Sequence, residues 1–83
     1  MDVTIKLFAS LREKAGTSNL IMSVPEGTNV QQLLSLIQAE KLELEGAIKG
    51  VLVAINHEYA SADTIINESD DLALIPPVSG GAQ

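Results

Sequence analysis

The stretch that sets the fold of this chain is Thr28-Asn29-Val30-Gln31-Gln32-Leu33-Leu34-Ser35-Leu36-Ile37-Gln38-Ala39 (residues 28–39). Its apolar residues recur three and four positions apart and form one stripe: Val30, Leu33, Leu34 and Ile37. That spacing is typical of an amphipathic helix that packs one face against a core. Thr28 and Gln31 lie three residues apart, which matches a capping box with Thr28 as the N-cap. The pattern therefore predicts one long helix over about residues 29–39.

Two strands are expected before this helix, because the apolar residues there alternate with polar ones. In residues 2–9 the two faces of the strand are Val3, Ile5 and Leu7 against Thr4, Lys6 and Phe8. In residues 18–24 one face is apolar: Leu20, Met22 and Val24. Between the strands, Ser10 is expected to cap a short helical turn over residues 11–15, which Gly16 ends.

The segments after the helix are an irregular acidic stretch (41–46), an interior strand (51–55), a turn (56–58), a short strand (59–60), a loop (63–69) and a final strand (72–75). The resulting order is strand, strand, helix, strand, short strand, strand. It predicts an α+β fold in which one mixed sheet has the main helix on one face, as in the β-grasp, or ubiquitin-like, plan. We expect one domain over residues 1–77 and a flexible C-terminal tail over residues 78–83.

Composition narrows the classes of function. A chain of 83 residues with a net charge of −6 has room for one small domain, and it has no basic cluster that could neutralise nucleic-acid phosphates or an anionic membrane. The absence of cysteine excludes disulfides, zinc–cysteine sites and cysteine-based sulfur chemistry. With no secretory signal or membrane-length apolar run, a cytoplasmic protein is expected. The acidic charge suits a basic partner protein, or it serves solubility alone.

The body of the chain has few candidates for chemistry. His57 is the single histidine, and in a turn beside Asn56 and Glu58 we interpret it as solvated rather than as a metal ligand. Asp70 and Asp71 could act as an acid–base pair if burial separated their pKa values, but a solvated turn is the simpler interpretation. No metal site and no catalytic constellation are expected here.

The chain ends in Pro76-Pro77-Val78-Ser79-Gly80-Gly81-Ala82-Gln83. Proline has no N–H and a fixed φ, so the pair of prolines ends the last strand. The two glycines have no Cβ and a permissive backbone, which suits a tail that threads into the active site of another protein. The alternative is a frayed terminus, where small residues are common.

Several segments together resemble the MoaD family, the small sulfur-carrying subunits of molybdopterin synthase. They are Leu7-Phe8-Ala9-Ser10-Leu11-Arg12-Glu13 with Gly16, Pro25-Glu26-Gly27-Thr28, Asn56-His57-Glu58-Tyr59, Asp63, Asp70-Asp71-Leu72-Ala73, and Pro76-Pro77-Val78-Ser79-Gly80-Gly81. The last of these segments is the most specific. The resemblance spans nearly the whole chain.

The resemblance implies a non-catalytic, sulfur-donating subunit that binds no cofactor itself. A MoeB-like enzyme would use ATP to adenylate Gly81, a sulfur donor would convert it to a thiocarboxylate, and Gly80 would permit close approach. The tail would then enter a MoaE-like large subunit, in a heterotetramer, and pass sulfur to a pterin precursor. The residues that the resemblance places at partner contacts are Phe8, Arg12, Tyr59, Ile75, Pro76, Pro77, Val78 and Ser79. For Phe8 and Ile75, ordinary core packing is the alternative.

Two features depart from the family pattern. Ala82 and Gln83 follow the second glycine, although only a free carboxylate can be adenylated. Either the dipeptide is removed, or this form is inactive as a carrier, or the extension is not part of the natural chain. Ser69 stands where the family usually has glycine, which suggests an altered or strained turn. Two alternative functions stay open: a ThiS-like carrier for thiamine synthesis, and a ubiquitin-like interaction module that is never processed.

Overall fold

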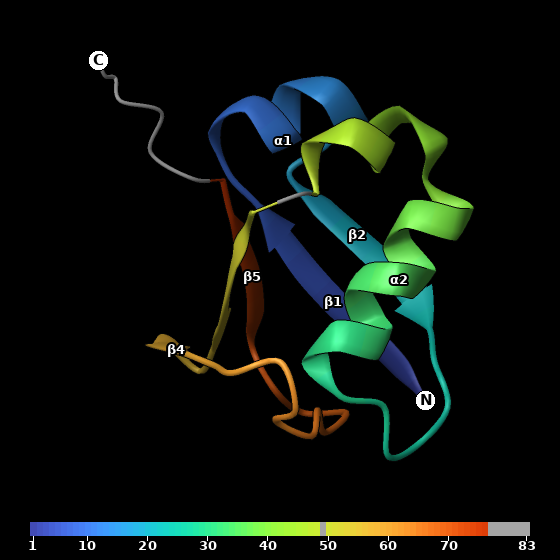
Figure 1. The fold of residues 1–83 in the computed structure, drawn as a ribbon, viewed down its shortest axis with the longest axis vertical. Coiled ribbons are helices and arrows are strands. Elements are labelled where there is room, and N and C mark those ends of the chain that lie inside the picture. The colour runs from blue at the N-terminus through green and yellow to red at the C-terminus, as the bar shows by residue number, and fades with distance from the viewer. Residues whose placement is uncertain (49, 77–83) are drawn as a thin grey trace.

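The computed structural model describes residues 1–48 and 50–76, which form a five-stranded mixed sheet with helices packed against it (Figure 1). The strands are β1 (Asp2–Leu7), β2 (Asn19–Ser23), β3 (Leu52–Ile55), β4 (Glu58–Tyr59) and β5 (Leu72–Ile75). The helices are α1 (Ala9–Ala15), α2 (Val30–Glu40) and the 3₁₀ helix η1 (Leu42–Ala47). This is the α+β arrangement that the order of elements predicts.

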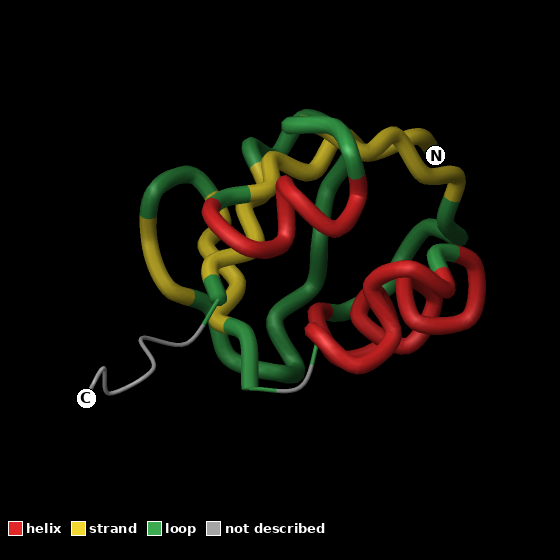
Figure 2. The backbone as a smooth tube through the Cα atoms, turned by 90° about the horizontal axis from the view of Figure 1, so that it is seen from above, coloured by secondary structure: helices red, strands yellow, loops and turns green. Residues whose placement is uncertain are grey.

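β5 lies in the middle of the sheet, whose strand order is β2-β1-β5-β3-β4. It pairs parallel to β1, with Leu7 opposite Leu74, and antiparallel to β3, with Val53 also opposite Leu74. A parallel pair needs a crossover connection, and the chain between β1 and β5 supplies it with α2. Figures 1 and 2 show the N-terminus and the end of β5 at opposite ends of the molecule, so β5 ends beside the end of β1.

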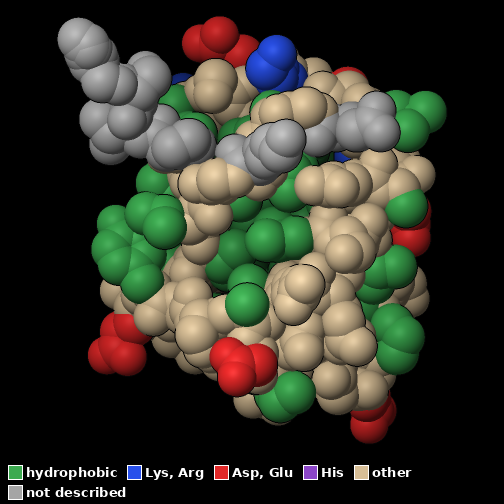
Figure 3. Space-filling view, in the orientation of Figure 1, with side chains coloured by type: hydrophobic (Ala, Val, Ile, Leu, Met, Phe, Trp, Pro, Cys, Tyr) green, Lys and Arg blue, Asp and Glu red, His purple; other side chains and the backbone are tan. Residues whose placement is uncertain are grey.

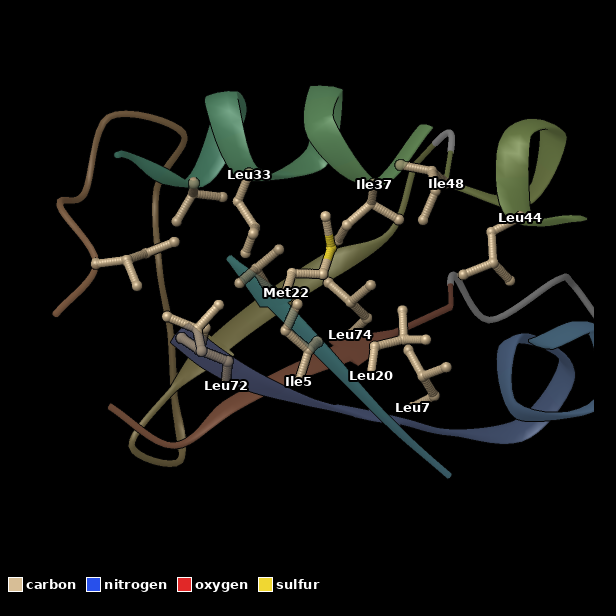
Figure 4. Close-up of a cluster of buried hydrophobic side chains, with 14 of the residues drawn as sticks. Ile5, Leu7, Leu20, Met22, Leu33, Ile37, Leu44, Ile48, Leu72 and Leu74 are labelled. Carbon is tan, nitrogen blue, oxygen red and sulfur yellow. The ribbon is translucent and has the colours of Figure 1, made fainter. Parts of the chain in front are cut away.

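The core forms between the inner face of the sheet and α2. Figure 4 shows Leu33 and Ile37 of α2 above side chains of the sheet, among them Ile5 and Leu72. The predicted inner faces of both N-terminal strands are buried: Val3, Ile5, Leu7, Leu20, Met22 and Val24. Aliphatic residues and Met22 build this cluster, whereas the two aromatic residues, Phe8 and Tyr59, are exposed.

The capping box of α2 lies one residue later than the sequence predicts. Asn29 is the N-cap: its side chain accepts from the backbone N–H of Gln32, and the Gln32 side chain accepts from that of Asn29. Thr28 is buried instead, and its hydroxyl donates to the Pro25 carbonyl at 2.6 Å. The helix cannot begin earlier because the carbonyl of Thr28 accepts from the backbone N–H of Ile66 at 2.9 Å.

Three other boundaries also differ from the prediction. β1 ends at Leu7, and α1 begins directly after Phe8, so Ser10 is a helical residue rather than the cap. The acidic stretch after α2 forms η1, because Leu44 is fully buried and anchors it in the core. The second hairpin turns tightly, since Glu58 already belongs to β4.

We predict that Asn29→Ala lowers the free energy of unfolding by about 1 kcal/mol, because the mutant loses the side-chain oxygen that satisfies a free N–H of the first helical turn. Urea denaturation followed by circular dichroism measures the loss. Gln31→Ala is the matched control, since Gln31 is exposed in the same helix outside the box and should change stability by less than about 0.5 kcal/mol. An equal loss in both variants would contradict the assigned cap.

Candidate functional site

The outer face of the sheet carries a row of side chains that crosses four strands. Lys6 of β1 lies opposite Ala73 of β5, Ala73 opposite Ala54 of β3, and Ala54 opposite Tyr59 of β4. Side chains alternate between the faces of a strand, and Leu72 and Leu74 point into the core, so this row points away from α2. Two alanines in the middle of the row leave little side-chain volume there.

The row forms the floor of a hollow of about 340 Å³, which we call the outer-face hollow. It is lined by Lys6, Phe8, Ala54, His57, Tyr59, Asp71, Ala73 and Ile75. Phe8 is 45% exposed, Tyr59 is 70% exposed, and Ile75 is half-buried. The structure therefore brings together three of the residues predicted for partner binding, and the exposure of Phe8 excludes core packing for it.

Charged side chains close one end of the outer-face hollow. Asp71 lies between two basic groups, with Lys6 Nζ at 3.6 Å from Oδ1 and His57 Nε2 at 3.5 Å from Oδ2. All three side chains are at least 39% exposed, so these contacts are screened by solvent and contribute little to folding. They make one end of the hollow polar, whereas the rest of its lining is apolar. The sequence prediction did not include Lys6 and Asp71 in the site, because only the strand register brings them together.

The turn before β4 is tied to the loop that precedes β5. Asn56 and His57 both have positive φ, 53° and 73°, as a two-residue hairpin turn requires. The Asn56 amide donates to Asp70 Oδ1 at 3.1 Å, and its oxygen accepts from the backbone N–H of Asp71 at 2.9 Å. Asp70 Oδ2 also accepts from the backbone N–H of Asn67 at 2.8 Å. The two adjacent aspartates thus have structural partners and do not form an acid–base pair.

The remaining predicted residues have different positions. Arg12 is exposed on α1 and lines a smaller hollow of about 240 Å³, which shares Lys6 and Phe8 with the outer-face hollow. Pro76 is half-buried directly after β5. The predicted residues Pro77, Val78, Ser79, Gly80 and Gly81 lie outside the described residues, as does the predicted domain boundary after residue 77.

Two smaller predictions concern turns. The side chain of His57 is 86% exposed, so its interpretation as a solvated turn residue is confirmed. Ser69 does not have a positive φ, so the suggestion of a strained turn there is wrong. Serine fits because the backbone N–H of Asp70 donates to Asn67 in an ordinary turn that does not require glycine.

Residues 1–48 and 50–76 contain neither a metal-binding cluster nor a membrane-spanning helix. No group of three or more histidine, cysteine, aspartate or glutamate residues in this part of the chain could hold a metal ion. No helix there is long and apolar enough to cross a membrane.

We predict that Asn56→Ala lowers the free energy of unfolding by about 1–2 kcal/mol, because it removes two hydrogen bonds and places alanine at a positive φ. Asn67→Ala is the control, since Asn67 takes part through its backbone N–H, which the substitution keeps. Chemical denaturation of both variants provides the measurement. A loss in Asn67→Ala as large as that in Asn56→Ala would show that the side-chain bonds of Asn56 are not the cause.

The sequence is similar to known proteins over nearly its whole length. The model described as "ThiS family" matches residues 5–81. A molybdopterin synthase sulfur carrier subunit from Arabidopsis thaliana is 35% identical over 81 residues, which cover 98% of this chain and 84% of that relative.

Solved structures agree on the fold. SAMP1 from Haloferax volcanii superposes with a TM-score of 0.84 at 30% identity, and the match covers 98% of this chain and all of that one. A complex of subunits 1 and 2 of molybdopterin-converting factor from Helicobacter pylori contains a chain that matches with a TM-score of 0.68. That match covers 98% of this chain and all of that one at 21% identity, so it supports the fold alone. The β-grasp prediction is confirmed.

Proposed function

This chain belongs to the ThiS family, and from that premise we propose that it carries sulfur, as a thiocarboxylate on Gly81, for the synthesis of molybdopterin. The observation that carries the proposal is the extent of the family match, which runs from residue 5 to residue 81 and so includes both glycines of the tail. Two relatives, matched over 81 and 83 residues, are named as sulfur carrier subunits of molybdopterin synthase.

The chemistry follows from what the chain contains. Hydrolysis of the peptide bond between Gly81 and Ala82 must first release Ala82-Gln83 and free the Gly81 carboxylate. A carboxylate is a poor electrophile, so one of its oxygens then attacks the α-phosphate of ATP and releases pyrophosphate. A sulfur donor then attacks the acyl carbon of the adenylate, and AMP leaves. Because the chain has no cysteine, the sulfur can be held only on this terminal acyl group. The catalytic residues belong to the partners: an adenylating enzyme that uses ATP and a large synthase subunit that binds the pterin precursor.

The outer-face hollow is the proposed docking site for these partners. Phe8, Tyr59 and Ile75 surround it, and large apolar side chains in such positions are typical anchors of protein interfaces. Ile75 is also the last residue of β5, so a partner that covers the hollow lies next to the start of the tail. The net charge of −6 favours a partner with a basic surface, chiefly through faster encounter.

A heterotetramer with the large subunit is part of this proposal. The cytoplasmic location and the absence of a bound cofactor stay predictions.

We predict that a chain ending at Gly81 is adenylated, whereas the chain that continues through Ala82-Gln83 is not, because a peptide carbonyl cannot attack ATP. Pyrophosphate release with the adenylating enzyme and the intact mass of the product provide the measurement. A chain ending at Ala82 is the control, since it has a free carboxylate on the wrong residue. Equal pyrophosphate release from the longer chain, with its mass unchanged by proteolysis, would contradict this role of Gly81.

We predict that Tyr59→Ala weakens binding to the large subunit by about 2 kcal/mol, roughly thirtyfold, because an anchor residue is lost. Stability should change by less than about 0.5 kcal/mol, since Tyr59 is 70% exposed. Titration calorimetry measures the affinity. Ile65→Ala is the control, because Ile65 is also exposed but lies outside the outer-face hollow. Unchanged affinity in Tyr59→Ala would remove Tyr59 from the docking site.

A thiamine-pathway carrier is the second candidate, and the name of the matching family model favours it. The two carriers share the activation of Gly81 and differ in the acceptor of sulfur. Thiocarboxylated protein offered separately to a molybdopterin synthase large subunit with its pterin precursor and to a thiazole synthase distinguishes them. Failure to form any thiocarboxylate would favour the third alternative, an interaction module whose tail is never processed.

A further inference from the structure

One side of the molecule is almost free of charge. Lys, Arg, Asp and Glu make up 19% of the chain, yet residues 15–39 contain a single charged side chain, that of Glu26. These residues form β2, the turn that follows it, and nearly all of α2. A hollow of about 580 Å³ on this side is lined by uncharged side chains of α2, with Pro25 and Glu26 at the turn. In Figure 3, which has the orientation of Figure 1, acidic side chains lie toward the margin of the face and hydrophobic side chains lie at its centre.

β2 is also an edge strand of the sheet, with β1 on one side and, among residues 1–48 and 50–76, no neighbouring strand on the other. The backbone N–H of Leu7 donates to Ser18 at 2.9 Å, and that of Val24 donates to Met1 at 2.8 Å. In an antiparallel pair the bonded positions alternate, so the even-numbered residues of β2 point their backbone groups at β1. Asn19, Ile21 and Ser23 therefore point theirs at the open edge.

At each end of this edge, an outward position has no backbone N–H available for a neighbouring strand. The Thr17 hydroxyl donates to the carbonyl of Asn19 at 3.1 Å and accepts from its N–H at 3.4 Å. Pro25, the next outward position after Ser23, has no N–H to offer. Between these ends, no hydrogen bond within the described part of the chain occupies the outward backbone groups of Ile21 and Ser23. Ile21 is also 70% exposed on the outer face of the sheet.

We propose that this edge is a homodimer interface, in which β2 pairs antiparallel with β2 of a second copy about a two-fold axis at Met22. In that register Ile21 lies opposite Ser23 of the second copy, and the two residues exchange backbone hydrogen bonds. Asn19 lies opposite Pro25 of the second copy. Pro25 cannot donate a backbone hydrogen bond, and Asn19 does not need one because Thr17 already bonds its backbone groups. The two five-stranded sheets become one.

A second copy fits this edge for two reasons. The edge is self-complementary in the stated register, because Asn19 at one end pairs with Pro25 at the other end of the second copy's strand, and Ile21 pairs with Ser23. β2 itself has no charged side chain, so two chains of net charge −6 meet through a strand that adds no repulsion of its own. Edge strands of monomers commonly carry a charged residue or a proline within the strand, and β2 has neither between Asn19 and Ser23.

The dimer leaves the outer-face hollow open. That hollow spans β1, β5, β3 and β4, whereas the proposed contact uses β2 at the opposite edge of the sheet from β4. Both copies could therefore present the hollow and the end of β5 at the same time.

Sedimentation equilibrium of the full chain over a range of concentrations tests the association. Ile21→Lys should weaken it at least about tenfold, because a charged side chain replaces an apolar one at the contact. Leu42→Lys is the matched control, since Leu42 is also 70% exposed and lies in η1, away from β2. A chain that stays monomeric at millimolar concentration, or equal weakening by both variants, would overturn the proposal.

Cross-linking tests the register, and the absence of native cysteines makes it direct. Ile21→Cys and Ser23→Cys chains are mixed and oxidised with diamide. Paired positions about 5.5 Å apart between Cα atoms suit a disulfide, so the mixture should yield mostly the mixed dimer. Predominant cross-linking of Ile21→Cys to itself would place the axis at Ile21 and overturn the stated register. Absence of any cross-linked dimer would overturn the interface.

Discussion

The central position of β5 is the constraint on which the rest of the structure depends. β5 forms a parallel ladder with β1 and an antiparallel ladder with β3, and both of its inward side chains, Leu72 and Leu74, are fully buried. Without β5 the sheet would separate into the β1–β2 and β3–β4 hairpins, and an isolated hairpin is marginally stable at best. β1 near the N-terminus must therefore pair with β5 near the C-terminus before both hairpins can pack into one core beneath α2.

The same strand joins the core to the candidate site. Its outward residues, Ala73 and Ile75, lie in the outer-face hollow, while its inward residues hold the sheet to the core. A partner that covers the hollow thus contacts a strand that is bonded on both sides, next to the point where the tail begins. The neutral edge at β2 lies at the other end of the strand order, so one small domain has room for two separate contacts.

Much of the fold could be predicted from the sequence, because apolar periodicity is a local property. The alternation in residues 2–9 and the helical stripe over residues 29–39 identified the inward faces of β1 and α2 correctly. Boundaries were less certain, because they depend on contacts with distant segments. The capping box was predicted at Thr28 and lies at Asn29, because the backbone N–H of Ile66 donates to the carbonyl of Thr28. That bond joins residues far apart in the chain, so a local sequence pattern cannot predict it.

The sequence by itself determined that sulfur cannot be held on cysteine and that Ala82 and Gln83 follow the two glycines, because both depend only on which residues are present. It also identified Phe8 and Tyr59 as candidate contacts, through resemblance. Only the tertiary structure decided that these residues surround one hollow with Asp71 at its end. The physical reason is strand order and register: residues far apart in the chain become neighbours only when β5 inserts between β1 and β3.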